Sequence, residues 1–184
     1  MRNQVVKDVE KEFLEPSFQY LVKNGLENTS VRDLCKAMDI SYGSIYYWFD
    51  GKDDIYTSVV EYGVGKAAKK LFSAAFEKMN NPELFFNTFL DDVDKCTEDL
   101  RLVFQFATSI DYGKVVRKKT EEFKDVYQKY INELSEMTGI SPDDMAPIIY
   151  LLISILVDYV VWQDREVSDM QMKFLYKVMS GLNK

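Results

Sequence analysis

The sequence contains no histidine, and this absence excludes several kinds of catalytic site. A Ser/His/Asp or Cys/His nucleophile system, an HExxH zinc site and a histidine general base all require an imidazole. The 184 residues carry 23 basic and 30 acidic side chains, a formal net charge of −7, which argues against a broad basic surface for nucleic acid or anionic lipid. We therefore expect no enzyme, no metal and no cofactor, although a small contact surface remains compatible with this composition.

Cysteine is scarce, and no apolar segment favours export or membrane insertion. The two cysteines, Cys35 and Cys96, each lie among apolar residues at helical spacing, which predicts free buried thiols. The N-terminus lacks the apolar core of a signal peptide. The longest apolar run, residues 145–162, contains Pro147 and Asp158 and falls short of the ~20 residues that span a bilayer. We interpret it as a helix buried in a core or subunit interface, and we expect a cytoplasmic protein with no membrane partner.

Apolar residues recur at helical spacing along the whole chain, and strand signals are nearly absent. This pattern predicts an all-α fold of about nine helices. The first is expected at residues 5–24, with a kink or restart at Pro16 because proline lacks an N–H. A long helix should begin at Lys52 and bend or break near Gly63 and Gly65. Later helices are expected at residues 82–98, 99–111, 114–138 and 142–162 and from Ser168 onward.

Two shorter helices lie between these long ones. Thr29-Ser30 offers an N-cap to a helix that begins at Val31, with apolar residues at i, i+3, i+4 and i+7. After a three-residue connection, Ser41 can cap a second short helix from Tyr42 to about Trp48. Two short helices joined by a tight turn and packed on a longer first helix form a helix-turn-helix unit.

The helix-turn-helix segment carries a specific set of motifs. Gly25 ends the first helix, the run Thr29-Ser30-Val31-Arg32-Asp33-Leu34 opens the second, and Gly43-Ser44-Ile45-Tyr46-Tyr47-Trp48-Phe49 precedes Lys52. In residue types and spacing, this segment resembles the DNA-binding domain of TetR-type transcriptional regulators, from roughly residue 10 to residue 60. The resemblance implies an N-terminal three-helix DNA-binding domain, residues 1–51, and a C-terminal helical ligand-binding and dimerisation domain, residues 52–184.

The resemblance and the chemistry of the segment indicate the same DNA-contacting residues. A recognition helix that enters the major groove must present small or polar groups at its leading end. We expect DNA contacts from Thr29, Ser30, Ser41, Tyr42, Gly43, Ser44, Tyr46, Tyr47 and Lys52. Ser41 has a plain helix cap as an alternative role, and Trp48 has two open roles, packing beneath the first helix or contact with the DNA backbone. Residues 1–60 carry 7 Lys/Arg against 10 Asp/Glu, so non-specific DNA affinity should be weak.

The remaining residues carry no comparable motif but are rich in aromatic and apolar side chains. An aromatic stripe at helical spacing is typical of a helix core and also of a pocket. We expect an apolar cavity for a small hydrophobic effector, with candidate lining residues Phe72, Phe76, Phe86, Phe89, Phe104, Tyr112, Phe123 and Tyr127. The resemblance implies that the last two helices pair with those of a second subunit, with candidate contacts at Ile148, Leu151, Leu152, Ile155, Leu156, Tyr159, Trp162, Leu175 and Met179.

Together these features predict a ligand-responsive transcriptional regulator. We expect a repressor that binds a palindromic operator in double-stranded DNA as a homodimer and is released by a small, largely apolar effector. The alternative is a helical small-molecule-binding or scaffold protein of the same fold without DNA binding. The excess of acidic over basic side chains in residues 1–60 supports this alternative. An enzyme that uses paired carboxylates such as Asp91 and Asp94 is the least favoured hypothesis, because exposed acids at helical spacing usually form a solvated face.

Overall fold

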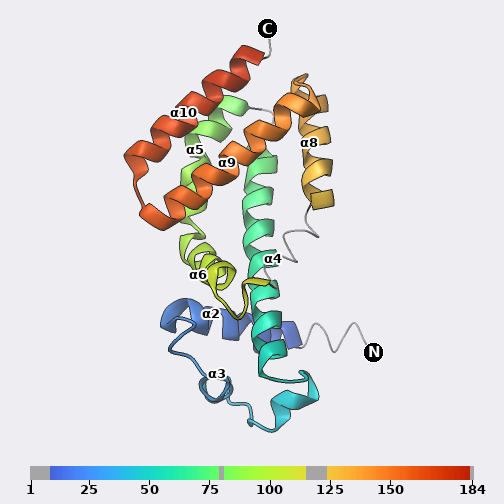
Figure 1. Ribbon diagram of the computed structural model, residues 1–184, viewed down its shortest axis with the longest axis vertical. Coiled ribbons are helices and arrows are strands. Elements are labelled where there is room, and N and C mark those ends of the chain that lie inside the picture. The colour runs from blue at the N-terminus through green and yellow to red at the C-terminus, as the bar shows by residue number, and fades with distance from the viewer. Residues whose placement is uncertain (1–8, 79–80, 115–123, 183–184) are drawn as a thin grey trace. The chain divides into compact units, whose positions relative to one another are not determined.

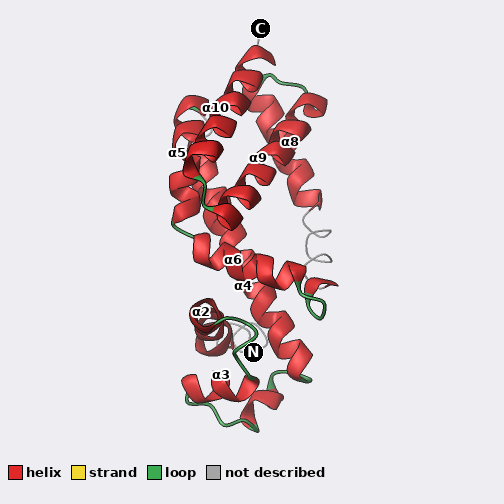
Figure 2. Cartoon of the chain, turned by 60° about the vertical axis from the view of Figure 1, so that its left-hand side comes forward, coloured by secondary structure: helices red, strands yellow, loops and turns green. Residues whose placement is uncertain are grey.

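The computed structural model describes residues 9–78, 81–114 and 124–182, and all regular structure in these ranges is helical (Figures 1 and 2). It contains eight α-helices there, α2 (Glu15–Asn24), α3 (Val31–Ala37), α4 (Lys52–Lys78), α5 (Pro82–Asp94), α6 (Thr97–Thr108), α8 (Lys124–Thr138), α9 (Pro142–Trp162) and α10 (Arg165–Leu182). Two short helical segments complete the described part, a π-helix at Glu10–Leu14 and a 3-10 helix at Ser44–Tyr47. The predicted all-α fold is confirmed, and the helix count is close to nine.

The helices group into two compact units. Among the described residues, the N-terminal unit comprises residues 9–68 and 98–114, and the C-terminal unit comprises residues 69–97 and 124–182. The N-terminal unit therefore contains the short helices, the first part of α4 and most of α6. The predicted domain boundary between residues 51 and 52 stays a prediction.

The first helix changes type just before Pro16. The backbone is π-helical over Glu10–Leu14 and α-helical over Glu15–Asn24. Proline has no N–H to donate to the preceding turn and its ring crowds that turn, which explains the wider π-helical geometry. Gly25 then ends α2 with φ 81°, a left-handed backbone that favours glycine, as the sequence predicted.

Gly63 allows α4 to lie against α2 in the core of the N-terminal unit. A Cβ added at Gly63 would lie 2.0 Å from Cε2 of Phe18, a side chain that is fully buried. The helix nevertheless runs without interruption from Lys52 to Lys78, so the predicted break is not observed. The glycine therefore serves close packing between helices.

The last two helices meet at a short connection in the C-terminal unit. The helix α9 has the predicted bounds, because the Ser141 hydroxyl accepts the Asp144 N–H at 3.2 Å and proline follows the cap. The helix α10 begins at Arg165, so its predicted start at Ser168 is wrong. Asp164 provides the cap instead, since its carboxylate accepts the Val167 N–H at 3.1 Å while Ser168 is buried.

Arg165 ties the start of α10 to α5. Its guanidinium lies 2.7 Å from Asp91 and 3.1 Å from Asp94, and the Tyr159 hydroxyl donates to Asp94 at 2.6 Å. Hydrogen bonding to Asp91 raises the pKa of Arg165 above its usual value. These two aspartates thus belong to an interhelical ion-pair cluster, which is a structural role.

The helix α9 is the one helix among the described residues that is long and apolar enough to cross a membrane, with a mean hydropathy of 2.0 in its most apolar window. One stripe of this helix, which includes Met145, Ile155 and Val160, is buried inside the C-terminal unit. The opposite stripe is exposed. Both faces of α9 therefore carry apolar side chains, and one face packs against its own unit.

Candidate nucleic-acid interface and ligand cavity

The segment predicted as the recognition helix is one turn of 3-10 helix, Ser44–Tyr47. The predicted short helix from Tyr42 to about Trp48 is therefore present, but only Ser44–Tyr47 is helical and its type is 3-10. The Trp48 N–H donates to Ile45 O at 3.0 Å, which is the i to i+3 pattern of a 3-10 turn. Ile45 and Phe49 are buried and anchor this turn in the core of the unit.

The leading edge of the recognition turn consists of small polar groups. The Ser41 hydroxyl accepts the Ser44 N–H at 3.1 Å, and the two hydroxyl oxygens lie 2.5 Å apart. Gly43 is exposed, and a Cβ added there would meet no atom within 4 Å. Ser41 thus accepts an N–H at the start of the turn, although Gly43 is the N-cap residue of the 3-10 segment itself. The backbone at Gly43 is open to close approach by another molecule.

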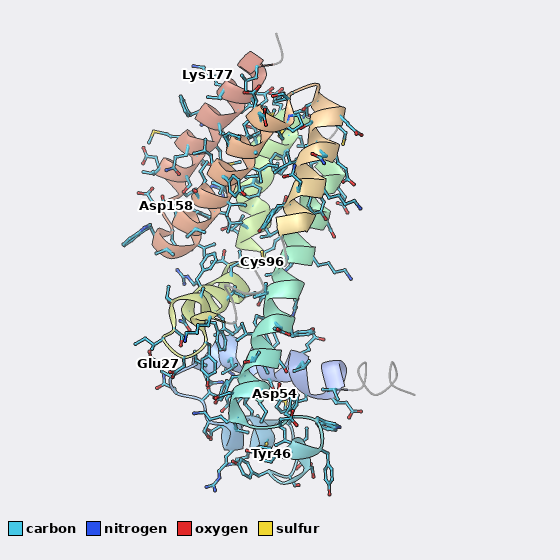
Figure 3. All side chains as sticks on the ribbon, turned by 45° about the vertical axis from the view of Figure 1, so that its right-hand side comes forward. Glu27, Tyr46, Asp54, Cys96, Asp158 and Lys177 are labelled. Carbon is cyan, nitrogen blue, oxygen red and sulfur yellow. The ribbon has the colours of Figure 1, made fainter. Side chains whose placement is uncertain are left out.

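Three tyrosines surround this edge, with Tyr46 labelled in Figure 3. The Tyr46 hydroxyl donates to the Tyr42 hydroxyl at 2.9 Å, and the two rings meet edge to face at 5.4 Å. The hydrogen bond raises the pKa of Tyr46, which keeps its hydroxyl protonated. Tyr47 is 88% exposed and extends its side chain into solvent. The tyrosines therefore add three exposed hydroxyl groups to those of the serines.

Thr29 and Ser30 have different environments although they are adjacent. Ser30 is exposed and forms a capping box with Asp33, in which the Ser30 N–H donates to the carboxylate at 2.8 Å. The hydrogen bond from the Ser30 hydroxyl, and then that from its N–H, lower the pKa of Asp33. Thr29 is buried, and its hydroxyl donates to Gly25 O at 2.8 Å. The Thr29 carbonyl accepts the Tyr56 hydroxyl at 2.6 Å. Ser30 is thus the member of this pair whose side chain faces solvent.

A depression lies between the N-termini of α3 and α4, and its lining includes Ser30, Arg32, Tyr42 and Lys52. The Arg32 guanidinium stacks over the Tyr42 ring at 5.3 Å, and Lys52 Nζ lies 5.7 Å from the Tyr56 ring centroid. The carboxylates of Glu27 and Asp33 also line this depression, so its two cations are balanced by two acids. Lys52, at the N-terminus of α4, combines a cation with a helix end, which favours anionic oxygen atoms such as those of a phosphate. Arg32 was not predicted as a DNA-contacting residue, although it lies inside the motif that begins at Thr29.

The C-terminal unit contains an apolar cavity of about 110 Å³. Helices α5, α8, α9 and α10 line it, and among the described lining residues none is charged. Aromatic and aliphatic side chains dominate the wall, which includes Phe85, Phe86, Tyr127, Tyr130, Leu134 and Met179. Burial raises the pKa of Tyr127, so its hydroxyl stays neutral. The cavity is therefore suited to a small apolar molecule.

The predicted pocket residues occupy several different environments. Phe86 and Tyr127 line the cavity, and Phe89 packs behind the wall with its ring 5.4 Å from that of Phe85. Phe104 and Tyr112 belong to the N-terminal unit. Phe123 and the side chains of Phe72 and Phe76 lie outside the described residues. Ile149 and Leu134 also line the cavity but were absent from the prediction, because aliphatic lining cannot be distinguished from core by spacing alone.

The predicted dimer residues divide between the two faces of α9 and α10. Leu151 and Trp162 are exposed, 50% and 74%, whereas Leu152 and Leu156 are half-buried. The other five are buried within their own unit, namely Ile148, Ile155, Tyr159, Leu175 and Met179. The same two helices carry further exposed apolar residues outside the predicted set, namely Tyr150, Val157, Val161, Val167, Met170, Phe174 and Val178. We call the exposed apolar residues of α9 and α10 the outer face.

Comparisons with known proteins agree with this fold and its N-terminal motifs. Residues 14–59 match the family described as "Bacterial regulatory proteins, tetR family". No curated protein matches the chain. The structure is similar to a TetR-family transcriptional regulator from Cytophaga hutchinsonii, with 19% identity, a TM-score of 0.70, and 95% of this chain and 94% of that chain covered.

Two further solved structures share the fold at low identity. A transcriptional regulator from Rhodococcus sp. Rha1 is 14% identical with a TM-score of 0.70, and 95% of this chain and 97% of that chain are covered. A TetR transcription regulator from Haloarcula marismortui ATCC 43049 is 15% identical with a TM-score of 0.64, and 96% of this chain and 98% of that chain are covered. These similarities show the fold, and the family match falls on the helix-turn-helix segment whose geometry is described above. Residues 14–59 therefore match the helix-turn-helix segment of the tetR family, and the described helices share the fold of solved tetR-type regulators.

Proposed function

We propose that this regulator is a ligand-responsive repressor, which binds a palindromic operator in double-stranded DNA as a homodimer and is released by a small, largely apolar effector. The main support is that one chain combines a tetR-type helix-turn-helix segment with an apolar cavity in its C-terminal unit. Regulators of this family are generally not enzymes, so we propose that the protein acts by binding alone. We further propose that it works in the cytoplasm and has no membrane partner.

The N-terminal unit supports DNA binding through a few placed groups. Lys52 and Arg32 lie at helix N-termini, where a cation and free N–H groups together favour phosphate oxygens. These contacts would fix the orientation of the protein on DNA, while Tyr42, Ser44 and Tyr47 would reach base edges. Because the unit has so few cations, binding should rest on geometry more than on net charge.

The outer face supports a homodimer. Leu151, Met170 and Phe174 are all at least half exposed and line one groove between α9 and α10. Apart from Ser154, Asp158 and Gln171, the lining of this groove is apolar. Contiguous exposed apolar surface of this kind marks an interaction site. A second copy related by a two-fold axis would cover it, and two recognition turns ~34–36 Å apart would then match a palindromic operator.

The helix α9 supports a link between the effector and the dimer. Ile148 and Leu152 line the cavity, whereas Leu151, which lies beside them on the helix, belongs to the outer face. A ligand that shifts α9 would thus change the surface on which the second copy packs. Because a ligand stabilises the conformation that it binds best, it would shift the population away from the DNA-binding dimer.

A gel-shift titration tests the proposal with DNA from upstream of the protein's own gene. Phe174→Glu should make the protein monomeric by light scattering and abolish the shift, because a carboxylate cannot be buried unpaired in an apolar interface. Ile110→Glu is the matched control, since Ile110 is 94% exposed but lies in the N-terminal unit. A Phe174→Glu protein that remains dimeric and still shifts the DNA would contradict the dimer arrangement.

A second candidate function is a small-molecule-binding or scaffold protein of the same fold that has lost DNA binding. The acidic balance of residues 1–60, 7 basic against 10 acidic side chains, is the observation that favours it. A folded, dimeric protein that shifts no upstream DNA even at low salt would support this candidate over the repressor.

A further inference from the structure

We propose that the effector is an uncharged molecule about the size of one six-membered ring, which binds in the cavity of the C-terminal unit. This inference rests on the proposed function, because it names the chemical class of the effector. Three properties of the cavity carry it, namely its volume, the absence of charge among its described lining residues, and its aromatic wall.

The volume limits the size of the ligand. The cavity measures about 110 Å³. A dry cavity of ~150 Å³ lined by aliphatic and aromatic side chains accepts benzene, so a volume of this order holds one ring with small substituents. Protein interiors are otherwise close-packed, and a second fused ring would have to displace whole side chains. The cavity therefore favours single-ring or similarly compact molecules.

The lining residues limit the charge of the ligand. None of those described is charged, so a buried carboxylate or ammonium would lose its hydration without gaining a counter-ion. Thr138 supplies little polarity, because its hydroxyl already donates to Leu134 O at 2.7 Å. The Tyr127 hydroxyl is neutral because burial raises its pKa. An uncharged ligand, with at most a hydroxyl group, fits this wall.

The aromatic wall favours a ring over an aliphatic chain. The Phe85 and Phe86 rings meet at 5.2 Å and 84°, and both line the cavity. Perpendicular rings offer one face and one edge to a third ring, which is the geometry aromatic groups prefer. Met145 and Met179 complete the lining, and their flexible side chains can adjust to ring substituents.

Calorimetry of the purified protein with a matched set of probes tests the ligand class. Toluene and benzoate have similar size and differ in charge, and naphthalene adds a second ring. Toluene should bind with a sub-millimolar dissociation constant, while benzoate and naphthalene should bind at least about tenfold more weakly. Equal or tighter binding of benzoate or naphthalene would overturn the inference, and so would a lack of toluene binding.

An enlarged cavity provides a gain of function that a misfolded variant cannot mimic. Leu134→Ala removes part of the wall and should allow naphthalene to bind at least about as tightly as toluene binds the original protein. Leu84→Ala is the matched control, because Leu84 is an exposed leucine of α5 that does not line the cavity. If Leu134→Ala leaves the preference for toluene over naphthalene unchanged, the cavity is not the binding site.

Release of DNA is measured separately, so that this inference and the proposed function can fail independently. Toluene that binds but leaves the upstream DNA fully bound would contradict ligand-induced release while leaving the site and its ligand class intact. Release by a charged or two-ring compound, without toluene binding, would overturn the ligand class while leaving the repressor function intact.

Discussion

Gly63→Ala is expected to destabilise the protein, and Gly65→Ala, two residues along the same helix, is expected to stabilise it. The new Cβ at position 63 would lie 2.0 Å from Phe18 Cε2, where ordinary van der Waals contact begins at 3.4 Å. Helix and ring would have to separate by about 1.4 Å, and Phe18 has no exposed surface into which to move. At position 65 no atom lies within 4 Å of the added methyl group.

These geometries set the size of the two effects. Overpacking of this severity costs about 3 kcal/mol, and alanine gains about 1 kcal/mol over glycine in a helix, so Gly63→Ala should lower the free energy of unfolding by about 2 kcal/mol. Gly65→Ala should raise it by about 1 kcal/mol, because only helix propensity changes. Urea denaturation followed by circular dichroism measures both. Equal stability of the two variants would refute the close approach of α4 to Phe18.

Two other predictions concern DNA contacts and pH. Lys52→Ala should weaken binding to all sequences alike and reduce the slope of log K against log salt by about 1, whereas Ser44→Ala should alter sequence preference, both measured by fluorescence anisotropy. Burial opposes ionisation of Asp92, but hydrogen bonds from Lys78 and Lys95 outweigh it and hold the pKa of Asp92 below its usual value. The ionised Asp92 carboxylate therefore contributes fully to the free energy of unfolding above the unfolded-state pKa of ~3.9. This contribution is lost as the pH falls through the lower pKa of the folded state. Asp92→Asn should lower the free energy of unfolding by about 2 kcal/mol at pH 7 and should remove the part of the acid destabilisation below pH ~4 that comes from Asp92. An acid-unfolding curve that the substitution leaves unchanged would contradict this role of the carboxylate.

Local signals in the sequence predicted the parts of the fold that depend on neighbouring residues. Ser141-Pro142 marked the start of α9, and Gly25 marked the end of α2, because caps and left-handed backbone need particular residue types. The start of α10 was misplaced because both Asp164 and Ser168 are acceptable caps by sequence. Only packing shows that Ser168 is buried and that Asp164 holds the first turn.

The candidate sites were harder to predict where burial decides the role of a residue. The helix α9 is apolar all round, so its sequence could not show that Ile155 faces its own unit while Leu151 faces solvent. Thr29 and Ser30 are adjacent hydroxyl residues, yet the tertiary contact with Tyr56 buries one and leaves the other exposed. Motifs predicted a helical segment near Ser44, but three-dimensional packing decided its length and which neighbouring side chains reach the surface.

The central claim is that this acidic regulator binds DNA through a few placed groups and is released by a neutral, single-ring effector. A fluorescence-anisotropy titration against upstream DNA, with and without toluene, tests both halves in one measurement. The account predicts saturable binding of two chains per site at moderate salt, a shallow salt dependence, and loss of binding when toluene is added. Absence of binding at low salt, or binding that toluene and other neutral single-ring compounds leave unchanged, would contradict it.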